Sequence, residues 1–144
     1  MKEKLLVSAC LLGEDCKYSG GNNYLPGIED LEERYELIPV CPEQMGGLPT
    51  PRVPAERVGD RVVNRAGEDV TEAYRRGAEA ALALAKAGGV RRAVLQERSP
   101  SCGSGRIYDG TFSGTLIPGQ GVAARLLAEN GVRVYAGDRF RELL

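Results

Sequence analysis

The sequence contains no histidine and no tryptophan among its 144 residues. The absence of histidine excludes a Ser-His-Asp triad, a Cys-His nucleophile pair and every metal site that needs an imidazole ligand. Acid–base chemistry in proteins otherwise relies mainly on carboxyl groups and a few weaker acids. A carboxyl group is therefore the natural proton donor or acceptor to look for in this chain.

Long apolar runs and an excess of one charge are also missing. No stretch approaches the roughly 20 apolar residues that a membrane helix needs, and the first residues lack the apolar region and cleavage site of a signal peptide. The formal net charge of -1 argues against a strongly basic nucleic-acid surface, although a nucleoside or the end of a tRNA can still bind. We expect a cytoplasmic protein with no membrane part and no nucleic acid as its main partner. The oligomeric state stays open.

What the chain has instead is an alternation of apolar runs and helical patterns. Four expected core strands cover residues 4–9, 36–41, 92–96 and 132–135; the expected helices cover 26–34, 69–87, 118–129 and a short stretch from 138, and a small hairpin covers 56–64. Such alternation predicts a parallel sheet with helices on both faces. The expected fold is thus α/β, Rossmann- or flavodoxin-like, with about four core strands, a hairpin insertion and a single domain over residues 1–144.

Three of the four cysteines follow these apolar runs. Cys10 ends the first run, Cys41 ends the second, and Cys102 lies in a loop of Ser, Pro and Gly after the third. The carboxyl ends of parallel strands meet at one edge of a sheet, so these three thiols are expected to lie close together. Cys16 lies in a polar loop and is a possible fourth ligand, a disulfide partner or a structural residue.

The spacing of the cysteines limits the kinds of metal or redox site that they can form. A single cysteine is most often a small buried apolar residue, but three at strand ends are harder to explain in that way. The chain has no Cys-x-x-Cys pair, which a structural zinc site or a thioredoxin-type redox site would use. Iron–sulfur clusters accept scattered thiolates, and three ligands would leave one iron open.

Polar residues beside the thiols are the candidate catalytic groups. Glu43 follows the second cysteine by two residues in a loop rich in proline, and Ser101 directly precedes the third cysteine. Glu97, at the end of the third strand, competes with Glu43 for the acid–base role. Arg52 and residues 108–109 are further candidates for the lining of a site. Each of these residues is also compatible with an ordinary surface loop.

The chain resembles a known family at these positions. The resemblance rests on Ser-Ala-Cys-Leu-Leu-Gly at 8–13, Pro-Val-Cys-Pro-Glu-Gln at 39–44, Gly-Gly-Leu-Pro-Thr-Pro-Arg at 46–52, Ser-Pro-Ser-Cys-Gly at 99–103 and Ile-Tyr-Asp-Gly at 107–110. These segments are similar to a family of small bacterial proteins whose characterised members are thiouracil desulfurases. The resemblance extends over nearly the whole chain.

The resemblance implies an enzyme with a 4Fe–4S cluster held by Cys10, Cys41 and Cys102, whose open iron takes the sulfur of the substrate. It implies Glu43 and Ser101 as catalytic helpers. The expected substrate is a small thiolated nucleobase or a related thiocarbonyl heterocycle, because soft sulfur binds iron. Two alternatives remain open: sulfur transfer to a nucleoside or tRNA, and a non-catalytic module stabilised by metal or disulfides.

Overall fold

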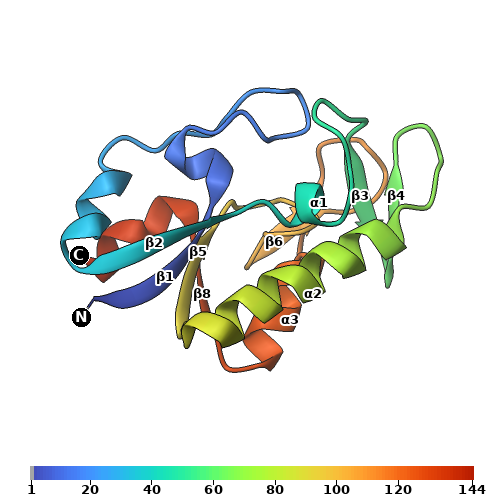
Figure 1. The fold of residues 1–144 in the computed structure, drawn as a ribbon. Helices are drawn as coiled ribbons and strands as arrows, with labels where there is room; N and C mark the ends of the chain where they lie inside the picture. The colour runs from blue at the N-terminus through green and yellow to red at the C-terminus, as the bar shows by residue number, and fades with distance from the viewer. Residues whose placement is uncertain (1) are drawn as a thin grey trace.

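The computed structural model describes residues 2–144, which are built around a four-stranded parallel sheet (Figure 1). Its strands are β1 (Glu3–Ser8), β2 (Tyr35–Val40), β5 (Arg92–Leu95) and β8 (Arg133–Ala136), in the order β2-β1-β5-β8. All three pairings are parallel, with Leu6 opposite both Ile38 and Ala93. The inner strands read as continuous apolar runs because both of their faces are covered. The predicted α/β fold class is confirmed.

The two faces of the sheet have separate cores. Leu5 and Val7 point to one side, and Leu6 points to the other, as the two-residue period of a strand requires. On the side of Leu6 pack the long helices α2 (Thr71–Gly88) and α3 (Val122–Glu129). On the opposite side lie the short 3₁₀ helices η1 (Ala9–Leu12), η2 (Ile28–Glu33) and η3 (Gly137–Leu143). Helices cover both faces, as predicted.

Two hairpins lie outside the main sheet. Strands β3 (Ala55–Val58) and β4 (Arg61–Asn64) form the expected hairpin, which lies beyond helix α1 (Pro42–Met45) in Figure 1. The second hairpin, β6 (Arg106–Tyr108) with β7 (Leu116–Pro118), is not among the elements expected from the sequence. Because Pro118 belongs to β7, helix α3 begins at Val122 and not at the predicted residue 118.

Helix α1 is held against α2 by direct backbone contact. A Cβ atom added at Gly46 would lie 1.9 Å from the carbonyl oxygen of Ala73, and one added at Gly77 would lie 1.8 Å from the carbonyl oxygen of Pro42. Only glycine allows two helices to approach this closely. The contact fixes the segment that follows β2, and with it Cys41 and Glu43.

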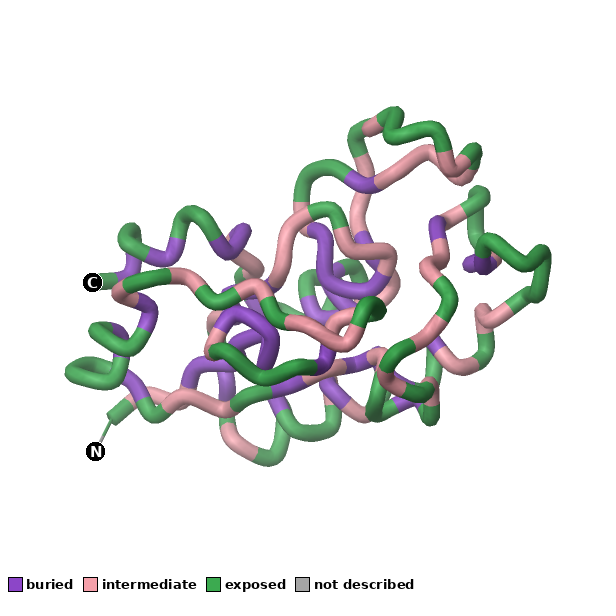
Figure 2. The backbone as a smooth tube through the Cα atoms, turned by 90° about the horizontal axis from the view of Figure 1, so that it is seen from above, coloured by how far each residue is buried: buried purple, intermediate pink, exposed green. Residues whose placement is uncertain are grey.

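The buried residues follow the sheet and the helices packed on it, whereas exposed residues dominate the outer loops and the hairpin turns (Figure 2). Within residues 2–144, no helix combines the length and the apolar character that crossing a membrane requires.

Candidate functional site

The structure brings the three strand-end cysteines to one cavity. Cys10 lies in η1 directly after β1, Cys41 is the residue before α1 at the end of β2, and Cys102 lies in the loop after β5. Because β2, β1 and β5 are parallel neighbours, their carboxyl ends share one edge of the sheet. All three cysteines line a cavity of about 520 Å³ at this edge, together with Glu43 and Arg52.

The three cysteines differ in their exposure to solvent. Cys10 and Cys102 are 8% and 6% exposed, and Cys41 is half-buried. Burial raises the pKa of Cys10 and raises that of Cys102 to about 12, although a hydrogen bond with Ser8 opposes the second shift. All four cysteines are free. Metal binding to such thiols must release protons, because a metal binds the thiolate form.

Cys16 lies closer to the other thiols than its polar sequence neighbourhood predicts. It is 3% exposed and lines the same cavity. Its carbonyl oxygen accepts a hydrogen bond from the Cys41 thiol at 3.7 Å and another from Arg52 Nη2 at 2.9 Å. Burial and the neighbouring thiols Cys41 and Cys10 raise the pKa of the Cys16 thiol. The backbone of Cys16 therefore takes part in the site, in addition to its side chain.

The loop that carries Cys102 is docked on the start of α3. The hydroxyl of Ser99 accepts hydrogen bonds from the backbone N–H groups of Ser101 and Cys102, both at 3.0 Å. The carbonyl of Ser101 in turn accepts the N–H groups of Ala123 and Ala124, at 2.8 and 3.0 Å. A Cβ atom at Gly121 would meet the Ser101 carbonyl carbon at 2.4 Å. Small residues are required here because two backbones touch.

Ser101, the second predicted catalytic helper, is buried directly before Cys102. The residue is 1% exposed and is not among those that line the cavity. Its hydroxyl has no hydrogen-bond partner within residues 2–144. Buried hydroxyl groups normally have a partner, so this one fits a site that is completed by a bound group or water.

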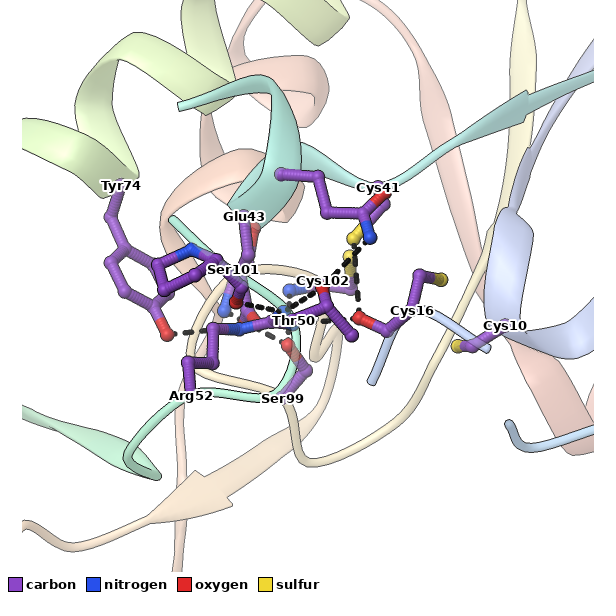
Figure 3. Close-up of polar contacts among 12 residues, drawn as sticks. Cys10, Cys16, Cys41, Glu43, Thr50, Arg52, Tyr74, Ser99, Ser101 and Cys102 are labelled. Carbon is purple, nitrogen blue, oxygen red and sulfur yellow. Dashed lines mark hydrogen bonds and ion pairs between the residues drawn. The ribbon is translucent and has the colours of Figure 1, made fainter. Parts of the chain in front are cut away.

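Glu43 is held by side chains from two other segments (Figure 3). Arg52 donates from Nε to Oε2 of Glu43 at 2.8 Å and also pairs with this oxygen through Nη2, while the Tyr74 hydroxyl donates to Oε1 at 3.1 Å. The remaining donors of Arg52 reach the carbonyl of Cys16 and two acceptors in its own loop. All five N–H groups of the Arg52 guanidinium thus donate hydrogen bonds. They link the segments that carry Cys16, Glu43 and Arg52 at the Glu43 carboxylate.

Three carboxylates of the described residues 2–144 line the cavity, and of these only Glu43 accepts no backbone N–H group there. Glu97 accepts backbone N–H groups of residues 98, 105 and 106, and these lower its pKa although burial opposes the shift. Glu56 accepts the N–H groups of Gly110 and Phe112. Glu97 and Glu56 therefore hold loops in place, whereas Glu43 is positioned by side chains beside the thiols.

The other sequence-based candidates divide into residues that line the cavity and a residue that stabilises a turn. Arg52 and Tyr108 line the cavity, while the carboxylate of Asp109 accepts hydrogen bonds from the N–H and hydroxyl groups of Thr111 and stabilises a turn. Sequence reasoning missed Tyr74, whose hydroxyl reaches Glu43 from helix α2. It also missed Asn23, whose amide donates to the Cys10 sulfur at 3.6 Å. Nothing in the turn-rich sequence around Asn23 marks that contact.

The donor set suits an iron–sulfur cluster. Three thiols from the ends of three neighbouring strands line one cavity, and cysteine thiolates are the usual protein ligands of such clusters. The all-thiol chemistry of Cys10, Cys41 and Cys102 therefore fits an iron–sulfur cluster.

Comparison with known proteins gives three consistent results. A family model described as 2-thiouracil desulfurase matches residues 5–139. The uncharacterised protein YbbK of Bacillus subtilis (strain 168) is 43% identical over 150 residues, which cover 97% of this chain and 99% of that protein. Among solved structures, the [4Fe-4S]-dependent thiouracil desulfidase TudS is similar with a TM-score of 0.92 and 48% identity, over 99% of this chain and 95% of that one.

Proposed function

The chain belongs to the 2-thiouracil desulfurase family, and on this basis we propose that it is a 4Fe–4S-dependent desulfurase that removes the sulfur atom from thiouracil or a related thiocarbonyl heterocycle. In the overall reaction water replaces sulfur: the C=S bond becomes C=O and hydrogen sulfide leaves, with no net oxidation. The observation that supports this most strongly is the cavity that Cys10, Cys41 and Cys102 share at one edge of the sheet.

We propose Cys10, Cys41 and Cys102 as the three cluster ligands. When bound, a cluster with three protein ligands supplies an iron position that a soft substrate sulfur can take. The chain's own contribution is to shield this position from bulk water and to fix the three thiols on strand ends. Cys16 contributes its carbonyl oxygen to the scaffold around Arg52, and the proposal does not need its thiol as a ligand.

We propose Glu43 as the group that moves protons between water, the heterocycle and the departing sulfur. It lines the cavity two residues after Cys41, and its carboxylate is held by Arg52 and Tyr74. Glu97, the competing candidate, already accepts hydrogen bonds from backbone N–H groups. Ser101 is the second proposed helper, because its buried hydroxyl has no partner among the described residues and directly precedes Cys102.

The proposal is tested by anaerobic reconstitution with iron and sulfide, followed by incubation with 2-thiouracil. We expect an absorption spectrum typical of an iron–sulfur protein, and the release of uracil and sulfide in equal amounts. The matched control is the same preparation after chelation of the iron. Equal product formation with and without iron, or none in a fully reconstituted sample, would contradict the proposed function.

A further inference from the structure

Two non-glycine residues within residues 2–144 adopt the left-handed backbone conformation, and both line the cavity. They are Arg98, with φ of 68°, and Phe112, with φ of 56°. A bulky aromatic residue rarely occurs in this region of backbone space. Such strained residues persist only where their surroundings fix them, and they concentrate at functional sites.

Phe112 is fixed by contacts with the hairpin β3–β4. One oxygen of the buried Glu56 carboxylate accepts the N–H groups of Gly110 at 2.9 Å and of Phe112 at 3.1 Å. The backbone at Gly110 is pressed onto the same hairpin, since a Cβ atom there would lie 2.8 Å from the carbonyl oxygen of Arg57. The backbone on both sides of the strained position is thereby held in place.

The ring of Phe112 is not used to build the protein core. Phe112 is half-buried and belongs to neither of the two apolar clusters on the faces of the sheet. Its ring lies 5.5 Å, from centroid to guanidinium carbon, from the exposed Arg65, which lines the same cavity. Core packing therefore does not explain why a large aromatic residue occupies a strained position at this cavity.

Resting on the proposed function, we propose that Phe112 is a specificity-determining residue whose ring stacks on the planar heterocycle of the substrate. An aromatic face binds a flat heteroaromatic ring by stacking and tolerates different ring substituents. The guanidinium of Arg65 lies over the same ring and stabilises it by a cation–π contact. The hairpin side of the cavity thus recognises the ring, while the sheet edge carries the thiols.

Two substitutions distinguish the role of the Phe112 ring from the role of the backbone conformation at this position. Phe112→Asn removes the ring, and asparagine tolerates the left-handed conformation better than phenylalanine does. Phe112→Tyr keeps the ring and serves as the matched control. For both variants, anaerobic calorimetry of the reconstituted protein measures the dissociation constant of uracil, a flat ring that is not consumed. Sulfide release measures KM and kcat for 2-thiouracil.

We expect Phe112→Asn to weaken uracil binding and raise KM by roughly tenfold, the usual size of one lost stacking contact. Iron content and kcat at saturation should stay near the wild-type values, and the melting temperature should not fall, because the backbone strain is relieved. Phe112→Tyr should bind uracil like the wild type.

An unchanged dissociation constant in Phe112→Asn, or a lowered melting temperature with lost iron, would overturn the inference, since the ring would then be irrelevant or merely structural. If the wild-type holoprotein binds uracil but releases no sulfide, the proposed function fails, and the calorimetric comparison still decides the role of Phe112. A wild-type holoprotein that does not bind uracil would overturn the inference as well.

Discussion

The two sides of the cavity are built in different ways. On one side, the ends of β1, β2 and β5 place Cys10, Cys41 and Cys102 on a buried parallel sheet. On the other side, the hairpins β3–β4 and β6–β7 lie outside that sheet (Figure 1). The β6–β7 hairpin carries the half-exposed residues Tyr108 and Phe112. Reactive groups need rigid support, whereas recognition residues can lie on loops that a scaffold positions. In our proposals, this difference separates the metal chemistry at the sheet edge from the substrate recognition on the hairpins.

The largest effect is expected from the sheet edge. Cys102→Ser should remove a cluster ligand and lower desulfurase activity to the level of the iron-free protein. The fold should survive, since the rest of the loop is held by Ser99 and by the backbone at the start of α3. Iron analysis, sulfide release and a melting curve check this expectation. Full iron content in this variant would contradict the assignment of Cys102.

A carboxylate on the same side gives the next largest effect. Glu43→Gln should keep the iron but lower kcat by roughly 10²–10⁴-fold, the usual contribution of a positioned acid–base group. Sulfide release at saturating 2-thiouracil measures the loss. Full activity with normal iron would leave Glu43 a purely structural partner of Arg52 and Tyr74 and return attention to Glu97. Lost iron would make Glu43 a ligand or a support for one.

On the hairpin side, a substitution of another glutamate, Glu56, should affect substrate binding and not the chemical step. Glu56→Ala removes the acceptor for the N–H groups of Gly110 and Phe112, so the loop between β6 and β7 loosens. We expect a loss of about 1–3 kcal/mol in stability from the unpaired N–H groups and a KM raised several-fold, with iron content unchanged. A fall in kcat with constant KM would break the proposed division between the two sides.

The smallest effect concerns Glu97, whose pKa is lowered from its usual 4.5 because loop N–H groups outweigh the effect of burial. A carboxylate with a depressed folded-state pKa stabilises the fold above its unfolded-state pKa, and this stability is lost as the pH falls through the folded value. Glu97→Gln should therefore cost roughly 1 kcal/mol at pH 7 and progressively less below pH 4.5. Urea unfolding at several pH values measures the difference, and a difference independent of pH would show that the charge is irrelevant.

The sheet could be predicted from the sequence because each strand is marked by a pattern of neighbouring residues. Continuous apolar runs mark buried parallel strands, and Gly59-Asp60 between two short runs marks the β3–β4 turn. The cysteines at three strand ends followed from the same patterns. Their convergence on one cavity follows from the parallel order of the strands and not from any spacing between the cysteines.

The surroundings of Glu43, the proposed catalytic carboxylate, could not be predicted from the sequence, because tertiary packing creates them. Helix α1 has only four residues, and its position depends on a backbone contact between Gly46 and α2. That contact brings the Tyr74 hydroxyl to Glu43, although Tyr74 reads as an ordinary core residue of an amphipathic helix. The second hairpin was missed because its strands have three residues each within a turn-rich stretch.

The central claim, three cysteine ligands with one open iron, is tested most directly by comparing iron and activity in Cys16→Ser and Cys102→Ser. Both thiols are buried and line the same cavity, so burial alone does not distinguish them. After anaerobic reconstitution we predict about four irons per chain and continued conversion of 2-thiouracil in Cys16→Ser, with neither in Cys102→Ser. Equal loss of iron in the two variants would indicate a site with four cysteine ligands and no open iron, and would contradict the account.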